Sequence, residues 1–186
     1  MRSVILDLVK SIDPYDERET ADRIDVLEWI CSGAELCRTA KPDIPPKHLV
    51  SYFVLVDSDS VLLVDHRDAQ LWLPTGGHVE PGEHPLSTAQ REAQEELGIE
   101  PEFLYPDPLF LTCSTTGGLS AGHTDVSLWF AVRGDRAQSY SFDRDEFKEI
   151  RWFTFKEIPH KSTSPHLKRF LDKLIYTHRH TDNLNR

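Results

Sequence analysis

The sequence predicts an α/β fold in which helices pack on the faces of a mixed β-sheet, with a helical extension before it. Segments of strand character and segments of helical periodicity follow one another in the order helix, strands, helix, strands, helix. The 186 residues match the length of one ordinary domain. With 39% hydrophobic and 28% charged residues, the composition is that of a soluble globular protein.

The first 47 residues are expected to form the helical extension and a connector. Between residues 14 and 38, apolar side chains recur at helical spacing at Ile24, Leu27, Ile30 and Ala34. The next segment, Lys41–Lys47, holds three prolines and cannot continue a helix. We therefore expect an extension over 1–47, whose role stays open, and one globular unit over 48–186.

The globular unit is expected to open with a β-hairpin. Leu49–Val56 is rich in β-branched and aromatic residues, the polar residues 57–60 suit a turn, and Val61–Val64 repeats the strand character. Further strands are predicted at Leu109–Cys113, Val126–Val132 and Ile150–Thr154, and helices at Pro85–Leu97 and Pro165–Ile175.

Charge and composition exclude several classes of partner. A net charge of −10 argues against binding to a nucleic-acid backbone, whereas a compact polyanion can still bind together with a divalent cation. No apolar run approaches the roughly 18–20 residues that span a bilayer, and no cleavage site follows the first residues. Cys31, Cys37 and Cys113 lack metal-ligand spacing, which indicates reduced thiols in a cytoplasmic protein.

The predicted helix Pro85–Leu97 carries the most informative residues. Its apolar side chains fall on one side of the helix, which should face the sheet: Leu86, Ala89, Ala93 and Leu97. On an adjacent side, Glu92, Glu95 and Glu96 stand at i, i+3 and i+4, so three carboxylates crowd into one patch. These like charges repel, and a hard divalent cation such as Mg²⁺ would relieve them. Taken alone, the same patch also fits a solvated acidic face with Arg91 as its partner.

The residues around this patch favour the cation. The spacing runs Gly77, five residues, Glu83, seven residues, Arg91-Glu92, and then Ala93, Glu95-Glu96, Gly98 and Ile99. This pattern resembles the Nudix box at every defining position. One departure precedes it, because Thr75 separates Pro74 from the two glycines.

The resemblance implies an α/β/α sandwich and a phosphoanhydride hydrolase that uses Mg²⁺ or Mn²⁺. It assigns Glu95 and Glu96 as metal ligands, Glu92 as a further ligand or the general base, and the Gly76 carbonyl as a ligand. Arg91 would pair with Glu83, while Gly77 and Gly98 would be structural. In some members an outside carboxylate acts on the water nucleophile, and Glu146 occupies a comparable place here.

Three further residues are candidates for binding the substrate. His78 directly follows Gly77, and His123 precedes a predicted strand, so each could reach phosphates or a metal. Arg67, after the second hairpin strand, could bind a phosphate bidentately. Each of the three has an ordinary surface or structural role as its alternative. Trp72 and Trp129 could stack on a base, although core packing is the better expectation for both.

The expected substrate is a small nucleoside diphosphate derivative, such as a nucleoside triphosphate or a nucleotide sugar, with no nucleic acid or membrane as partner. Two other functions remain open. One is a nucleotide-binding sensor that has lost catalysis, which retention of Glu92, Glu95 and Glu96 disfavours. The other is an isoprenoid diphosphate isomerase on the same fold, for which Cys113 alone gives thin support. A homodimer also stays open.

Overall fold

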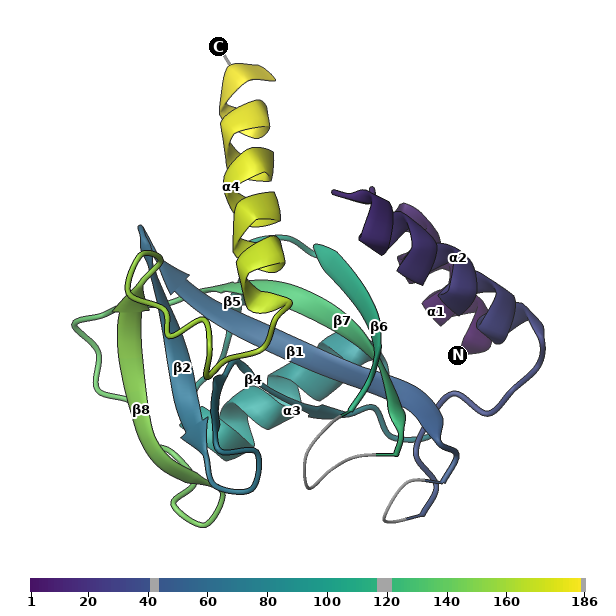
Figure 1. Cartoon of the computed structure of the whole chain (residues 1–186), viewed down its shortest axis with the longest axis horizontal. Coiled ribbons are helices and arrows are strands. Elements are labelled where there is room, and N and C mark those ends of the chain that lie inside the picture. Colours follow the sequence, from purple (N-terminus) through teal and green to yellow (C-terminus); the bar gives the residue numbers. More distant parts are fainter. Residues whose placement is uncertain (41–43, 117–121, 185–186) are drawn as a thin grey trace.

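A computed structural model describes residues 1–40, 44–116 and 122–184, so part of the predicted connector, residues 41–43, lies outside the described residues. The α/β class is confirmed: a mixed eight-stranded sheet lies between α3 on one face and α4 on the other, with α2 beside β6 and α1 packed against α2 (Figure 1). The helices are α1 (Arg2–Ser11), α2 (Glu17–Cys31), α3 (Pro85–Leu97) and α4 (Leu167–Leu184). The strands are β1 (Lys47–Asp57), β2 (Ser60–His66), β3 (Leu71–Leu73), β4 (Thr75–His78), β5 (Glu102–Phe103), β6 (Phe110–Thr115), β7 (Thr124–Arg133) and β8 (Phe147–Thr154).

Strand β1 organises the sheet. One edge of β1 runs parallel to β7 along nearly its whole length, from Lys47 beside Thr124 to Val56 beside Arg133. On the other edge, β2 pairs with β1 only next to the hairpin turn. Strand β4 pairs antiparallel with β1 farther along the same edge, at residues 50–53. The sheet therefore forks between β2 and β4, and this fork opens the floor on which the candidate site is built.

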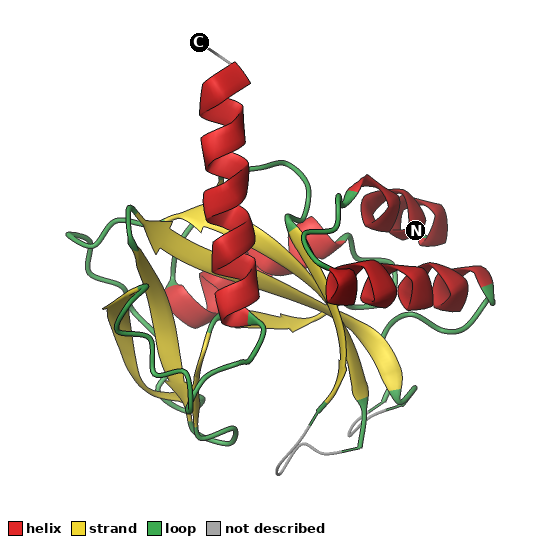
Figure 2. Ribbon diagram, turned by 45° about the horizontal axis from the view of Figure 1, so that its top comes forward, coloured by secondary structure: helices red, strands yellow, loops and turns green. Residues whose placement is uncertain are grey.

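Successive side chains of β1 and β7 point to opposite faces of the sheet and pack in two separate apolar clusters, as expected for strands buried on both faces. Leu49, Phe53 and Leu55 pack with α1, α2 and α3, whereas Val54 and Val56 pack with α4. Helix α3 contributes Ala89, Ala93 and Leu97 to the first cluster, the apolar side predicted from its spacing. Figure 2 shows the sheet with helices on its two sides.

The N-terminal segment differs from its prediction in three ways. A first helix, α1, precedes α2 and was not predicted. Helix α2 begins only after Asp16, whose side chain accepts the Glu19 N–H as an N-cap. Its buried apolar residues are Val26 and Ile30, while Ile24 is 54% exposed. The predicted apolar face was therefore right for Leu27 and Ile30, which pack in the core, and wrong for Ile24.

Ionic contacts attach α2 to β6 and α4. The Glu19 carboxylate is buried, and its Oε1 atom accepts from the Leu111 N–H (3.0 Å) and from Lys173 Nζ (2.8 Å). Arg169 donates two hydrogen bonds to the Asp16 carboxylate, at 2.7 and 2.6 Å. The extension is therefore clamped to the far end of the chain, and whether 1–47 and 48–186 are separate units stays a prediction.

The helices of the described residues are all too short or too polar to cross a bilayer. The cytoplasmic location stays a prediction.

Candidate active site

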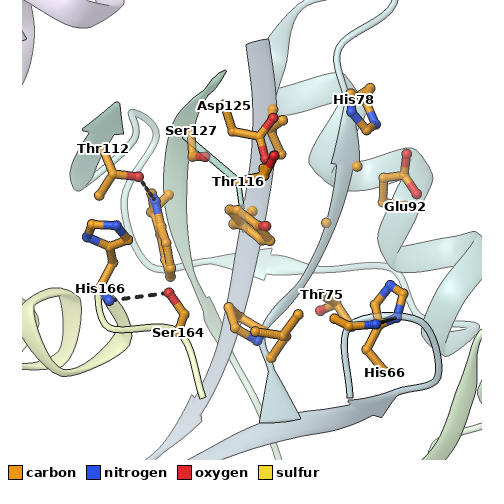
Figure 3. A pocket seen from close by; sticks show the side chains of 18 of the residues that line it. His66, Thr75, His78, Glu92, Thr112, Thr116, Asp125, Ser127, Ser164 and His166 are labelled. Atoms are coloured by element: carbon orange, nitrogen blue, oxygen red, sulfur yellow. Dashed lines mark hydrogen bonds between the residues drawn. The ribbon is translucent and has the colours of Figure 1, made fainter. Parts of the chain in front are cut away.

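A cleft of about 1190 Å³ opens at the fork of the sheet (Figure 3). Its floor follows one face of three paired strands, because Tyr52 lies beside Trp129 in the register of β1 and β7 and beside Gly76 in that of β1 and β4. Further lining residues come from β2, β6, α3 and the loop before β8. Figure 3 places Glu92 and His78 on one side of the cleft and His166 on the other.

The two glycines of the box bring β4 unusually close to its neighbours. At Gly77, an added Cβ would lie 1.9 Å from Glu92 Oε1, so only glycine leaves room for that carboxylate. At Gly76, where φ is +154°, an added Cβ would lie 2.3 Å from the Ser51 carbonyl oxygen. Thr75 stands in the register opposite Phe53 and its hydroxyl donates to the Phe53 carbonyl (3.2 Å), so the residue inserted before the glycines belongs to β4.

Glu92 and Glu96 line the cleft from α3, and both are withdrawn from water. Glu96 is only 5% exposed, and its Oε2 atom accepts the Gly76 N–H at 3.1 Å. Burial raises the pKa of Glu96 well above its usual range, and the negative charges of Glu92 and Glu146 raise it further. Burial likewise raises the pKa of Glu92, which Arg91 opposes. The cleft thus concentrates carboxylates at a cost in electrostatic free energy.

Arg91 connects the acidic residues to one another. Its Nε donates to Glu83 Oε1 (3.1 Å), and its Nη1 donates to Glu92 Oε1 (2.7 Å). Glu83 in turn accepts the Thr88 hydroxyl at 2.7 Å. The hydrogen bond with Glu83 raises the pKa of Arg91, which therefore stays charged. These contacts hold the loop before α3 against the helix.

Glu95 has a different environment from the other two glutamates of α3. Its carboxylate is 60% exposed, lies 3.2 Å from Arg91 Nη1, and is not among the residues that line the cleft. Gly98 ends α3 at a φ of +65°, the left-handed conformation that glycine adopts without strain.

The loop before β8 brings Glu146 to the cleft, whereas Arg67 stays outside its lining. Glu146 Oε1 lies 3.3 Å from His66 Nε2, and its charge acts on both Glu92 and Glu96. Arg67 is exposed, and its Nε donates to the Arg144 carbonyl at 3.0 Å. Arg67 thus occupies an exposed loop position, which was the alternative role considered for it, and its binding of a phosphate stays a prediction.

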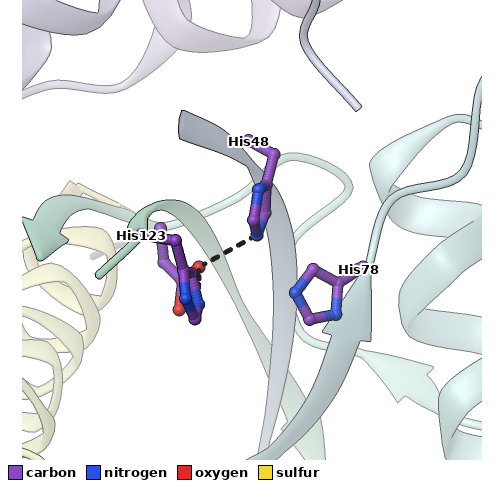
Figure 4. Close-up of side chains that lie close together, drawn as sticks. His48, His78 and His123 are labelled. Carbon is purple, nitrogen blue, oxygen red and sulfur yellow. Dashed lines mark ion pairs between the residues drawn. The ribbon is translucent and has the colours of Figure 1, made fainter. Parts of the chain in front are cut away.

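His78 and His123 converge with two residues that sequence reasoning missed, His48 and Asp125 (Figure 4). His48 and Asp125 are register partners across β1 and β7. One ligand atom of each of the four residues lies within 4.8 Å of the others. The pairing of two strands distant in sequence brings them together, and no local motif signals it.

The N-terminal segment also reaches the cleft, through Arg18 and Arg38. Both are cationic and neither was singled out from the sequence.

Trp129, beneath the cleft, is buried, its Nε1 donates to the Thr112 hydroxyl (3.1 Å), and its ring centroid lies 4.8 Å from that of Tyr52.

Trp72 and Cys113 lie outside the cleft lining. Trp72 packs edge-on against Phe153, with ring centroids 4.9 Å apart. Cys113 Sγ lies 3.2 Å from Asp25 Oδ2, and burial, together with this hydrogen bond, raises the pKa of its thiol to about 12. Such a thiol stays protonated, so Cys113 gives no support to isomerase chemistry.

Comparison with known proteins gives a consistent picture. A family model described as NUDIX domain matches residues 46–174. Bis(5'-nucleosyl)-tetraphosphatase [asymmetrical] of Rattus norvegicus is 43% identical over 54 residues, which cover 29% of this chain and 37% of the relative. The chain thus spans little more than a third of the length of that curated relative.

Solved structures resemble this one in fold. The E. coli dihydroneopterin triphosphate pyrophosphohydrolase aligns over 77% of this chain and 99% of its own, with a TM-score of 0.60 and 17% identity. A C. elegans Ap4A hydrolase binary complex aligns over 69% of this chain and 96% of its own, with a TM-score of 0.56 and 17% identity. At these identities the likeness concerns the fold alone.

Proposed function

Because the chain belongs to the NUDIX domain family, we propose that it is a divalent-metal-dependent hydrolase of a phosphoanhydride bond in a nucleoside diphosphate derivative. The observation that carries the proposal is the pair of carboxylates on α3, the buried Glu96 and the half-buried Glu92, which face a large cleft beside the two glycines of β4. An acidic face made only for solubility would be exposed and would not need the space that Gly77 leaves.

The donor atoms of this patch fit a hard cation. Glu92 and Glu96 offer carboxylate oxygens, the ligand type that Mg²⁺ and Mn²⁺ prefer. Their burial, and the added charge of Glu146, disfavour ionised carboxylates in the absence of a compensating charge. We propose that Glu92 and Glu96 hold the cation, with the Gly76 carbonyl and a reoriented Glu95 as further ligands. When bound, the cation supplies charge neutralisation at the phosphate oxygens and activation of water.

Other residues of the cleft are candidates for proton transfer and for binding the phosphates and the nucleoside. Glu146 and Glu92 are the two candidates for accepting the proton of the attacking water, and His66 orients Glu146 by the contact of 3.3 Å. Arg18 and Arg38 place positive charge in the cleft, where they would bind the phosphates that leave with the product. Tyr52, whose ring packs against the buried Trp129, would supply an aromatic surface for the nucleoside.

The proposed substrate class is a nucleotide with an extended phosphate chain. Its support is the name of the rat relative, a bis(5'-nucleosyl)-tetraphosphatase, together with the size of the cleft. Pockets for small molecules usually measure roughly 300–1,000 Å³, and this cleft of about 1190 Å³ exceeds that range. A dinucleoside polyphosphate or a nucleoside triphosphate suits such a volume better than a nucleoside monophosphate.

A substrate panel tests the proposal. Dinucleoside polyphosphates, nucleoside triphosphates and nucleotide sugars are incubated with the protein and Mg²⁺ or Mn²⁺, and the products are identified by mass. We expect hydrolysis that depends on the cation. Glu96→Gln and Glu92→Gln should lower turnover about 100-fold or more while preserving the fold. Glu157→Gln, on an exposed turn after β8, is the matched control that keeps full turnover.

Two results would count against the hydrolase. One is equal turnover of Glu96→Gln and the unchanged protein on every substrate. The other is tight nucleotide binding without cleavage of any compound, which would favour the sensor function.

A further inference from the structure

Three histidines and one aspartate gather where β1 and β7 begin (Figure 4). His78, His123 and Asp125 line the same cleft as Glu92 and Glu96, and His48 is buried behind them. His48 and Asp125 face each other across the two strands, and His123 immediately precedes β7. His78 joins them from the end of β4, opposite Val50. We propose that His48, His78, His123 and Asp125 bind a borderline transition-metal cation such as Zn²⁺, separate from the carboxylate site on α3.

The hydrogen bonding of His48 leaves a lone pair directed into this cluster. The side chain is 0% exposed, and its Nδ1 lies 2.8 Å from the Pro45 carbonyl oxygen. A carbonyl can only accept, so Nδ1 carries the hydrogen and Nε2 carries the lone pair. Among the described residues Nε2 has no hydrogen-bond partner, and it faces Asp125 Oδ1 at 3.4 Å. Two acceptors facing each other in a buried place repel, and a cation between them makes both contacts favourable.

His123 repeats the arrangement from the other side of the carboxylate. The Thr116 hydroxyl donates to the His123 carbonyl (3.1 Å) and lies 3.2 Å from His123 Nδ1. On the other side of the ring, His123 Nε2 lies 3.2 Å from Asp125 Oδ1. Histidines that bind metals usually have their second ring nitrogen held by a carbonyl, carboxylate or water in this manner.

The distances suit a tetrahedral ion. Metal–ligand bonds of about 2.0–2.1 Å place neighbouring ligand atoms of a tetrahedral site roughly 3.3 Å apart. The separations of Asp125 Oδ1 from the two histidine nitrogens, 3.4 and 3.2 Å, match that edge. The ring of His78 is 4.9 Å from that of His48, and rotation of the His78 side chain would complete the shell.

The donor set also separates this site from the one on α3. Imidazole nitrogens select Zn²⁺, Co²⁺ and Ni²⁺, whereas carboxylate sites select Mg²⁺ and Mn²⁺. One cleft would thus hold two cations of different chemistry. The proposal concerns metal binding alone and does not depend on the hydrolysis proposed above.

Titration with Co²⁺ alone tests the site, because tetrahedral Co²⁺ has visible bands far stronger than those of the hydrated ion. The full chain is first stripped of metal with a chelator. We expect one equivalent to bind with a tetrahedral spectrum, in the presence of excess Mg²⁺ and also in the Glu92→Gln/Glu96→Gln variant. His123→Gln and Asp125→Asn should each weaken Co²⁺ binding about 100-fold or more.

Two further variants make the result decisive. His160→Gln removes an exposed histidine outside the cleft and should leave the titration unchanged. His78 lies on the half-buried strand β4, and His78→Gln removes one ligand while leaving His48 and Asp125 unchanged. This variant tests the site even if Asp125→Asn fails to fold. Unchanged Co²⁺ affinity in His78→Gln and His123→Gln overturns the proposal. So does loss of the tetrahedral spectrum in the Glu92→Gln/Glu96→Gln protein.

Discussion

Gly77 determines where the Glu92 carboxylate lies. The carboxylate occupies the space that a side chain at position 77 would fill, so only glycine permits this arrangement. The conformation of Gly77 does not require glycine, since its φ lies outside the positive range. Glycine is needed at this position because it has no side chain. The residue therefore serves the placement of a proposed ligand rather than the path of the backbone.

Substitution of Gly77 by alanine should lower activity without unfolding the protein. The added methyl group would lie 1.9 Å from Glu92 Oε1, so the carboxylate must move by about 1 Å or more. A displacement of that size at a reacting centre costs on the order of 100-fold in rate. We expect that loss in kcat for Gly77→Ala, measured on the best substrate of the panel, with an unchanged circular dichroism spectrum.

Gly82→Ala, in the same loop, is the control. A Cβ at Gly82 meets nothing within 4 Å, although its φ of +85° strains any other residue. This variant should lose about 1 kcal/mol of stability and retain its kcat. Equal kcat values for both variants would show that the Glu92 position is not critical.

The sequence revealed those site residues whose relation is local. The three glutamates of α3, Gly77 and Glu83 follow a fixed spacing along one turn and helix, so a pattern identifies them. His48 and Asp125 become neighbours only when β1 pairs with β7, a register that no single segment encodes. Phosphate binding by Arg67 stays a prediction, and in the structure its Nε donates to the Arg144 carbonyl.

Helix α2 depends on contacts with residues far away in the sequence. Its buried residue Glu19 accepts hydrogen bonds from β6, from Tyr15 and from Lys173 on α4. A buried ion pair contributes little net stability when complete, yet removal of one partner leaves an unpaired charge.

Lys173→Ala should therefore destabilise the protein strongly. Lys173 and Glu19 are both buried, at 6% and 0% side-chain exposure, and the loss of one charge from such a pair costs roughly 3–5 kcal/mol. Urea unfolding should show this decrease. Lys168→Ala, which breaks the exposed pair with Asp172 on the same helix, should cost no more than about 0.5 kcal/mol. Similar losses in both variants would mean that the Glu19 pair is not special.

Prediction of the elements succeeded where periodicity is strong. Helix α3 was predicted with its observed bounds, and the hairpin of β1 and β2 with nearly its own. Strands β3, β4 and β5 are two to four residues long, too short for any period to show. Ile30 lies on the buried face of α2 as predicted, but Ile24 is exposed and Val26 is buried in its place.

At the scale of the whole molecule, we expect the free energy of unfolding to decrease at acidic pH because of His166. This residue is buried in the wall of the cleft, and its Nδ1 lies 3.2 Å from Arg169 Nη1. Burial lowers its pKa to about 4, and the positive charges of Arg18 and Arg169 act in the same direction against Asp16.

The sign of the effect follows from proton binding. Between pH 6.5 and about 4 the unfolded chain takes up a proton at His166 that the folded protein refuses, so stability falls as pH falls through that window. The slope contributed by this one group is at most about 1.4 kcal/mol per pH unit. Urea unfolding across this range should show a smaller decrease for His166→Gln than for the unchanged protein. Parallel curves for the two proteins would exclude His166 as the source.

The buried ion pair between Glu19 and Lys173 also affects the order in which the elements fold during translation. The two residues are 154 positions apart, and ribosomes add roughly 5–20 residues per second. During translation the Glu19 carboxylate thus waits on the order of 10–30 s for its cation. Until then it stays in water, since burial without a partner is costly. Helix α2 is synthesised before the sheet, and it consequently docks fully only after α4 has been made.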